Sequence, residues 1–494
     1  MSVLTALARI EATRSGRAQP IATVRHCHVA RRPLVVIPLR MAGEAAAPLA
    51  VMVGSGPEDA TVLIVPQPRD RQLRFHFTAE LADIVLPYLS SFLADTETVT
   101  PKSGDAWERC LDSPQLWVPN QGGTTFLKLM GRSVRFRRAD GPNPVPESVP
   151  LLGRWLTWFG DRAEHPGSSA LLAMTSVLGG HWATGQSGME DGNLAAQLGW
   201  IDPPAGSTGA QAAALAEDPI ESPPAGPATD PGFDNEELAP LLTAYDTAID
   251  DDLRVLAGER IRHALEQQLA PTWRLMWRAI DLLRAMPAGA SVAARWDGDR
   301  SQFSRFHRNI PESHPQPRRD SPVPAVRRLL AREQAQQALD VQRAYDDPLV
   351  MAEYRLSGDA FRGLVVECDP TRLIVNASGK KLLRPEIRVH TTDPVAMAIG
   401  TELHAVESRG QKGRVLGIDG EIVTLELSGG MGNGHTAKPG SVPSPGHRLT
   451  FTGLSPSGFQ RPHELPKPED TPWTHGGPPP EWTPNPADAQ EEWS

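Results

Sequence analysis

The sequence predicts a multidomain α+β protein with an N-terminal α+β domain, a central helical bundle, a small C-terminal β-barrel, and a disordered linker and tail. Short apolar runs bounded by proline and glycine in residues 1–145 are typical of buried strands. Apolar residues recur at steps of three and four in residues 237–290, which indicates helices. Short strand-like segments separated by turn signals follow from about residue 356 and favour a barrel.

Residues 1–145 are predicted to form the α+β domain. Its candidate strands lie in the segments RPLVVIPLRMAG, PLAVMVGSG, ATVLIVPQP and QLRFHFTAE. In the last segment, Leu73, Phe75 and Phe77 alternate with polar residues, which is the period of a half-buried strand. A helix is expected around AELADIVLPYLSSFLAD, and GTTFLKLMGRSVRFRRADG is predicted to form a further hairpin.

The next two segments differ sharply in composition. Residues 146–202 are predicted to form a helical subdomain, because Leu151, Trp155 and Trp158 recur at helical spacing. Residues 203–236 are rich in proline, glycine, alanine and acidic residues, and bulky apolar side chains are scarce there. Such a composition buries too little surface to offset the entropy of ordering, so we expect a disordered linker and a domain boundary.

Residues 237–355 are predicted to form the helical region. Leu242, Tyr245, Ile249 and Leu253 recur at steps of three, four and four, as on one face of a helix. Pro271 stands where a second helix can begin, since a proline in the first turn loses no hydrogen bond. An α-hairpin or a small bundle is therefore expected here.

Residues 356–454 are predicted to form the small β-barrel. Within GRVLGIDGEIVTLELSGG, Asp419 and Gly420 fit the two central positions of a type I′ turn. This turn would pair Ile418 with Glu421 and extend into a hairpin. The hairpin carries no recognisable arrangement of a nucleophile with a general base, so we expect it to be a scaffold.

Residues 455–494 are predicted to be a disordered, proline-rich, acidic tail. A solvated acidic segment has little reason to retain large aromatic rings. We therefore expect the tail either to bind a groove on a partner protein or to pack on the barrel. The candidate partner-binding residues are Trp473, Trp482 and Trp493.

Composition narrows the class of protein. The formal charge is −10, so a global basic field that would attract nucleic acid is absent, although local basic patches remain possible. The three cysteines, Cys27, Cys110 and Cys368, are too few and too far apart for a disulfide framework or a zinc motif. We expect a cytoplasmic protein without a signal peptide or a membrane partner. Arginine greatly outnumbers lysine, which is typical of GC-rich bacterial genomes, and the whole chain is similar to proteins of such bacteria.

Recognisable catalytic signatures are missing from the sequence. Gly-x-Ser-x-Gly, HExxH and a GxGxxG that follows a strand do not occur. We therefore expect no cofactor, no metal and no catalytic residue. An alternative is a hydrolase with an unrecognised site in residues 150–202, where acidic residues accompany His165 and His181.

The segment GTELHAVESRGQKGRVLGIDGEIVTLELSGGMG resembles the accessory β-barrels that precede the motor core in some superfamily 1 helicases. The resemblance implies a partnership with a nucleic-acid motor. A Walker A loop is absent, because NASGKKLL offers Gly379-Lys380 but has Lys381 next and Ile374 where the first glycine belongs. This chain is therefore expected to assist an ATPase encoded separately.

The segment ARWDGDRSQFSRFHRN interleaves basic and aromatic residues. Arginine neutralises phosphates, and aromatic rings stack on unpaired bases, so this pattern predicts contact with single-stranded nucleic acid. The alternative is a solvated loop whose rings pack on the helical bundle. The candidate nucleic-acid-binding residues are Arg295, Trp296, Arg300, Phe303, Arg305, Phe306 and Arg308.

Two further segments offer weaker candidates. In KLMGRSVRFRR, Arg135 and Arg137 would share one strand face and could meet phosphates, or could simply guard a sheet edge. In RHCHVARR, His26 and His28 would share one strand face, but two ligands do not make a metal site.

These observations favour a non-catalytic adaptor that binds nucleic acid weakly or assists a separately encoded helicase or ATPase. The first alternative is a protein-only scaffold in a bacterial defence or regulatory complex. The second is the hydrolase described above.

Overall fold

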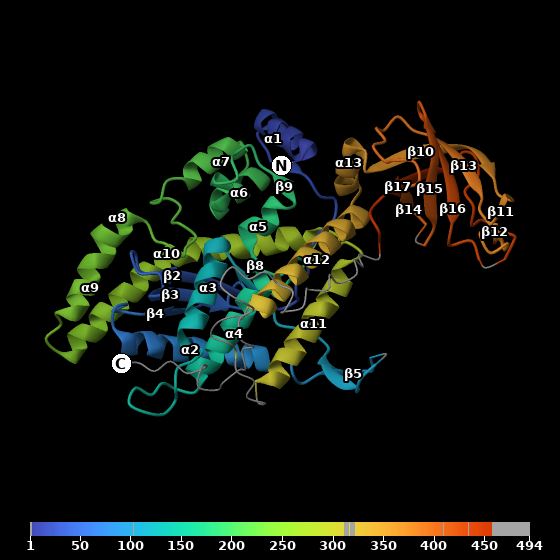
Figure 1. Cartoon of the computed structure of the whole chain (residues 1–494). Coiled ribbons are helices and arrows are strands. Elements are labelled where there is room, and N and C mark those ends of the chain that lie inside the picture. Colours follow the sequence, from blue (N-terminus) through green and yellow to red (C-terminus); the bar gives the residue numbers. More distant parts are fainter. Residues whose placement is uncertain are drawn as a thin grey trace, which may run out of the picture. The chain divides into compact units, whose positions relative to one another are not determined.

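The computed structural model describes residues 2–101, 103–310, 316, 322–408, 410–432 and 434–456. They fall into two compact units. The larger unit contains Thr5–Ala335, and the smaller contains residues 336–456 together with residues 2–4. Figure 1 shows helices and sheets in the larger unit, and the barrel in the smaller one. The expected α+β class, helical centre and C-terminal barrel are confirmed.

A five-stranded mixed sheet, in the order β4-β3-β2-β7-β8, forms the centre of the larger unit. The strands β2, β3 and β4 form an antiparallel meander, and β7 and β8 continue the sheet in parallel with β2. Almost every residue of β2 and β3 is buried, which explains their continuous apolar sequences. The strands are β2 (Leu34–Arg40), β3 (Pro48–Gly54), β4 (Thr61–Ile64), β7 (Leu116–Val118) and β8 (Leu171–Ala173).

Helices cover both faces of this sheet. Alternate residues of β2 point to opposite faces, so Val36 joins one core cluster and Val35 joins another. The cluster around Val36 is covered by α2 (Arg71–Ser90), α3 (Gln121–Val134), α4 (Ser148–Ala163) and α11 (Val292–Asn309). The cluster around Val35 is covered by α5 (Met174–Gly179), α6 (Leu194–Ile201), α7 (Gly209–Ala216) and α10 (Asp251–Ala285).

The segment QLRFHFTAE is helical, so the predicted strand over residues 73–77 is wrong. It belongs to α2, whose N-cap Asp70 accepts hydrogen bonds from the main-chain N–H groups of Gln72 and Leu73. The buried side chains Phe77 and Leu81 continue a helical repeat along α2. Five alternating residues are compatible with both periods, and only the longer window separates a helix from a strand.

The predicted hairpin in GTTFLKLMGRSVRFRRADG is also wrong, because this segment forms α3 and its C-terminal extension. The helix packs closely on α4 at glycines of both helices. A Cβ atom added to Gly131 would lie 2.7 Å from the main-chain nitrogen of Thr157, and one added to Gly153 would lie 2.6 Å from that of Arg135. Arg135 caps α3, so it does not share a strand face with Arg137.

The predicted boundaries around residues 146–202 and 203–236 do not separate compact units, because Thr5–Ala335 form one. The segment predicted to be a disordered linker contains α7, the short helix α8 (Pro231–Phe233) and the π-helix Asp234–Leu238. Ala213 of α7 and Phe233 lie in the same core cluster as Trp200. A few apolar residues therefore suffice to order this segment, because they cover a surface that the rest of the chain provides.

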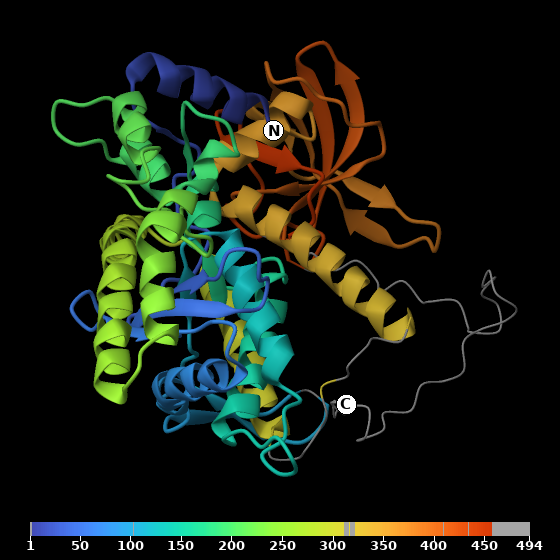
Figure 2. The same cartoon turned by 90° about the vertical axis from the view of Figure 1, so that its left-hand side faces the viewer.

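The helical region is confirmed, although Pro271 lies inside α10 and does not begin a new helix. The buried residues Leu269, Trp273 and Trp277 continue across the proline, so core packing maintains one helix despite the missing hydrogen bond. Helix α9 (Ala239–Asp246) lies beside the first turns of α10 (Figure 1 and Figure 2).

The remaining elements outside the barrel strands are short or peripheral. In the larger unit, β1 pairs with β9 and β5 pairs with β6, both antiparallel. The larger unit also contains β1 (Gln19–Pro20), β5 (Thr96–Val99), β6 (Trp107–Cys110), β9 (Trp182–Ala183) and the 3-10 helix Glu190–Gly192. The smaller unit contains α13 (Pro348–Ser357), and the residues of α1 (Val3–Ser15) and α12 (Pro322–Asp346) are divided between the two units. Among the described residues, every helix is too short or too polar to cross a membrane.

The smaller unit is a closed antiparallel barrel in the order β10-β13-β16-β15-β14-β17. Its interior contains fully buried aromatic and branched side chains, among them Phe361, Val389, Leu425 and Phe451. A separate hairpin is formed by β11 (Leu373–Val375) and β12 (Lys381–Leu383). The barrel strands are β10 (Ala360–Asp369), β13 (Glu386–His390), β14 (Glu402–Ala405), β15 (Lys412–Asp419), β16 (Ile422–Ser428) and β17 (Arg448–Thr452).

The hairpin of β15 and β16 is present, but its turn lies one residue later than predicted, and Ile418 pairs with Val423 where Glu421 was expected. Asp419 pairs with Ile422, so Gly420 and Glu421 occupy the turn, and Gly420 has a φ of +58°. A register irregularity between Val415 and Gly417 then adjusts the strand. The glycine supplies the left-handed conformation at the first turn position, where the sequence pattern placed the aspartate.

Candidate nucleic-acid interface

The basic and aromatic segment predicted to contact nucleic acid forms helix α11. Its inward face contains Val292, Trp296, Asp299 and Phe303, which are buried and recur at steps of four, three and four. The segment is therefore an amphipathic helix and not the solvated loop considered as the alternative. Candidate residues on the inward face are buried, and those on the outward face reach solvent.

Trp296 and Phe303 are core residues. The Nε1 atom of Trp296 donates a hydrogen bond to the carboxylate of Asp112 at 2.9 Å, and its ring stacks on His28 at a centroid distance of 4.1 Å. Phe303 is 0% exposed and packs against Trp155 at 5.4 Å. Their predicted role as stacking platforms for bases is incompatible with this burial.

Arg295 and Arg300 attach α11 to neighbouring segments. Arg295 donates a hydrogen bond to the main-chain carbonyl of His26 at 2.7 Å. Arg300 donates to the carbonyl of Cys110 at 3.1 Å and forms an ion pair with Glu97 of strand β5. These contacts give both guanidinium groups a structural role.

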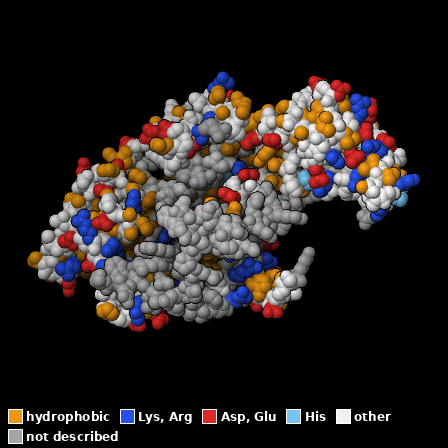
Figure 3. Space-filling model, viewed as in Figure 1, with side chains coloured by type: hydrophobic (Ala, Val, Ile, Leu, Met, Phe, Trp, Pro, Cys, Tyr) orange, Lys and Arg blue, Asp and Glu red, His pale blue; other side chains and the backbone are white. Residues whose placement is uncertain are grey.

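Arg305 and Arg308 are exposed and both lie close to one aromatic ring. Their Cζ atoms lie 5.1 Å and 5.9 Å from the ring centre of Trp107, a half-buried residue of strand β6. Figure 3 shows Lys and Arg side chains gathered beside hydrophobic ones in the area of α11 and the β5–β6 hairpin. We call Trp107, Arg305 and Arg308 the Trp107 surface.

Phe306 is half-buried between this surface and the core. Its ring lies 4.9 Å from that of Trp155 and 5.6 Å from that of Trp158. It therefore supports α11 and has only part of its ring available to a ligand.

Sequence reasoning missed Trp107. Its segment is short, and its distance from α11 along the chain gives no local signal. Pairing with Val99 across the β5–β6 hairpin places it, and the fold then brings it to α11. The predicted partner-binding residues of the tail, Trp473, Trp482 and Trp493, lie outside the described residues.

The histidines of the candidate hydrolytic and metal sites have structural contacts. Nε2 of His181 accepts a hydrogen bond from the main-chain N–H of His26, and its Nδ1 donates to the carbonyl of Val177. Burial lowers the pKa of His165, and the nearby Arg162 guanidinium lowers it further. Among the described residues, no group of three or more histidine, cysteine or acidic side chains is placed to hold a metal ion.

His28 gives a testable pH dependence of stability. Burial lowers its pKa from 6.5 to about 4, against the opposing effects of Asp112 and Asp299. The unfolded chain therefore binds a proton on His28 at a higher pH than the folded protein does. Stability is unaffected by His28 above pH 6.5 and falls as the pH is lowered towards 4, by at most about 3 kcal/mol.

We expect His28→Phe to remove this contribution while it keeps an aromatic ring against Trp296. Urea unfolding monitored by tryptophan fluorescence, compared between pH 7 and pH 4.5, measures the effect. The wild type should lose more stability than the variant over this interval. Equal losses in both proteins would contradict the assignment to His28.

Comparisons with known proteins do not assign the chain to a family. No family model, curated protein or solved structure matches it. A function can therefore be inferred only from the geometry and charge of the protein's own surfaces.

Proposed function

We propose that this protein is a non-catalytic adaptor that binds single-stranded nucleic acid through the Trp107 surface and assists a separately encoded helicase or ATPase. The observation that carries the proposal is a partly exposed indole with two exposed guanidinium groups within 6 Å of its centre. Arginine neutralises phosphates, and both the indole and guanidinium planes stack on bases of any sequence. Three residues provide a small footprint, so binding is expected to be weak and sensitive to salt.

The ion-pair pattern supports this choice. Arg109 of β6 and Arg300 of α11 both contact the carboxylate of Glu97, which neutralises charge at the base of the surface. Arg305 and Arg308 form no ion pair among the described residues. They are therefore the cations of α11 that can exchange water for phosphate at the lowest cost.

Charge reversal at both arginines tests the surface. We expect Arg305→Glu/Arg308→Glu to weaken binding of a labelled single-stranded oligonucleotide at least about tenfold, measured by fluorescence anisotropy at low salt. Arg260→Glu/Arg274→Glu is a control with the same change in charge, at two exposed positions of α10. If both double variants lose the same amount of affinity for the oligonucleotide, the effect comes from the change in net charge alone. That result would contradict the proposed surface.

Trp107→Ala separates stacking from charge. We expect it to weaken binding by about 1–3 kcal/mol at every salt concentration, because the lost contribution is stacking on a base. The arginine effect should instead shrink as salt rises. A protein that binds no oligonucleotide, yet keeps its partner after nuclease treatment in a pull-down, would favour the protein-only scaffold.

A further inference from the structure

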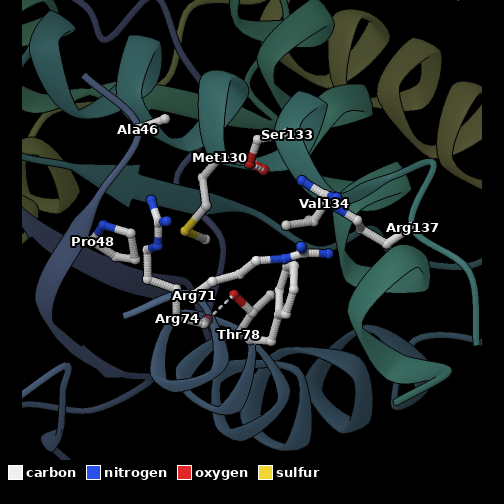
Figure 4. A pocket seen from close by; sticks show the side chains of 10 residues that line it. Ala46, Pro48, Arg71, Arg74, Thr78, Met130, Ser133, Val134 and Arg137 are labelled. Atoms are coloured by element: carbon white, nitrogen blue, oxygen red, sulfur yellow. Dashed lines mark hydrogen bonds between the residues drawn. The ribbon is translucent and has the colours of Figure 1, made fainter. Parts of the chain in front are cut away.

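Two further features of the described residues take no part in the Trp107 surface. One is a pocket of about 390 Å³ between α2, α3 and the start of β3, where Arg71 and Arg74 face Met130 and Ser133 (Figure 4). Arg71 and Arg137 of its lining have partners of their own, so the pocket does not gather uncompensated charge for an anion. The other feature is the β11–β12 hairpin of the smaller unit.

Strand β11 is paired along one of its two edges. The hairpin is a two-stranded sheet, so β12 occupies one edge of β11 and no described strand occupies the other. Across the hairpin, the main-chain N–H of Asn376 donates a hydrogen bond to the carbonyl of Lys380 at 3.0 Å. Hydrogen-bonded pairs alternate with non-bonded pairs in an antiparallel ladder. The main-chain N–H and C=O groups of Leu373 and Val375 therefore point away from β12.

The side chains at this unpaired edge are apolar and exposed. Leu373 is 42% exposed and Val375 is 64% exposed, with the half-buried Ile374 between them. The outer edge of β12 differs, because Leu383 is buried and its carbonyl accepts a hydrogen bond from the guanidinium of Arg384. Proteins protect strand edges with a lysine, a proline, a bulge or a covering segment. Strand β11 has none of the first three, so we expect a covering segment.

The tip of the hairpin is basic. Lys380 and Lys381 are exposed, and their ammonium groups form no ion pair in the part of the chain that the structure describes. At the other end of the hairpin, the carboxylates of Glu386 and Glu426 both pair with Arg372 and do not neutralise the lysines. A segment that covers the edge should therefore be extended, partly apolar and acidic.

The chain itself contains such a segment outside the described residues. Residues 457–494 contain seven acidic and two basic side chains, and proline recurs among them. Proline lacks the N–H group that an added strand donates to its neighbour. The longest stretch without proline in this range is ADAQEEWS, residues 487–494, and three of its eight side chains are carboxylates.

We propose that residues 487–494 add to the unpaired edge of β11 as a third strand, within the same molecule. At the period of a strand, Ala487, Ala489 and Trp493 share one face and provide apolar contact for the exposed side chains of β11. The carboxylates of Glu491 and Glu492 neutralise the basic tip. In such an addition, main-chain hydrogen bonds supply affinity and side chains supply specificity.

The covalent connection favours pairing within one molecule. Residues 453–486 join the last barrel strand to this segment, and a chain of that length spans up to about 110 Å when extended. The smaller unit has a radius of gyration of about 14 Å at its size, so every face of it lies within reach. A tethered segment acts at an effective concentration of up to about millimolar, so a weak contact suffices. The contact does not depend on the function proposed above.

Hydrogen exchange of the full-length protein, resolved to single amides, tests the pairing. We expect the amides of Leu373 and Val375 to exchange at least about tenfold faster in a variant that lacks residues 487–494. The amide of Val389 in β13 is the internal control, because the barrel ladder protects it in both proteins. Unchanged exchange at Leu373 and Val375 would overturn the proposal.

Charge reversal within the segment separates a specific contact from general attraction. Glu491→Lys/Glu492→Lys should accelerate exchange at the β11 edge as the deletion does. Glu469→Lys/Asp470→Lys is the matched control, since it makes the same change in charge outside residues 487–494. Equal acceleration in the two double variants would show that any acidic stretch suffices and would overturn the assignment.

Reversal on the hairpin completes the test. Lys380→Glu/Lys381→Glu should also accelerate exchange at the β11 edge, and its combination with Glu491→Lys/Glu492→Lys should restore slow exchange. Failure of the combined variant to recover protection would contradict direct pairing of these charges.

A second copy of the chain is the competing occupant of the edge. Pairing within one molecule predicts that protection of Leu373 and Val375 is independent of protein concentration. Protection that rises with concentration would identify a strand from a neighbouring molecule and overturn pairing within one chain.

Discussion

We expect Asp299→Ala to lower the free energy of unfolding of the larger unit by about 3–5 kcal/mol. Asp299 is 1% exposed, and its carboxylate accepts hydrogen bonds from Arg162 at 2.9 Å, from the hydroxyl of Ser168 at 2.7 Å and from the main-chain N–H of Ser169 at 2.6 Å. The substitution leaves the mostly buried guanidinium of Arg162 without its counter-charge and two further donors unpaired. Urea unfolding monitored by tryptophan fluorescence measures the change.

Asp297→Ala is the matched control on the same helix. The side chain of Asp297 is 51% exposed and pairs with Arg300, so its loss should cost no more than about 1 kcal/mol. A destabilisation by Asp299→Ala as small as that of Asp297→Ala would mean that the network does not hold α11 against α4 and the segment before β8.

The second large effect is expected in the barrel. Phe451→Ala should lower the stability of the smaller unit by about 3–5 kcal/mol, because the ring is 0% exposed and contacts Phe361 at a centroid distance of 5.8 Å. The loss of volume at the centre of a closed barrel cannot be compensated by one strand moving alone. Hydrogen exchange of peptides from residues 360–452 reports this unit separately from the rest of the chain.

Val375→Ala provides the comparison within the same unit. Val375 lies on the β11–β12 hairpin and is 64% exposed, so the substitution should change stability by less than about 0.5 kcal/mol. If exchange in the barrel strands is as slow in Phe451→Ala as in Val375→Ala, the aromatic pair contributes little to this core.

The sequence predicts elements well where a pattern is long. The apolar repeat of α10 continues over many turns, and the closely spaced strand patterns after residue 356 do close into a barrel. Short patterns fail: the alternation of Leu73, Phe75 and Phe77 fits a strand, although these residues belong to α2. Residues 203–236 look disordered alone, because the core they cover is formed by distant residues such as Trp200.

The candidate sites show the same limit. Arg305 and Arg308 were predicted from composition, whereas the aromatic partners predicted with them, Trp296 and Phe303, are buried by the amphipathic pattern of α11. Trp107 joins the arginines only through tertiary contacts. The pocket between α2 and α3 is not predictable from these patterns, because the start of α2 (residues 72–80) and the segment of α3 both indicate strands, although the rest of α2 is correctly predicted to be helical.

The closed ring of six strands limits how the smaller unit can recognise a peptide. Each strand of the ring is hydrogen-bonded to a neighbour on both sides. An extended peptide therefore finds no free strand edge at which it could add a further strand to this sheet. Recognition by this ring must therefore use outward side chains and the loops between strands. For the same reason, the strands of this ring offer no free edge through which the barrels of two neighbouring molecules could pair.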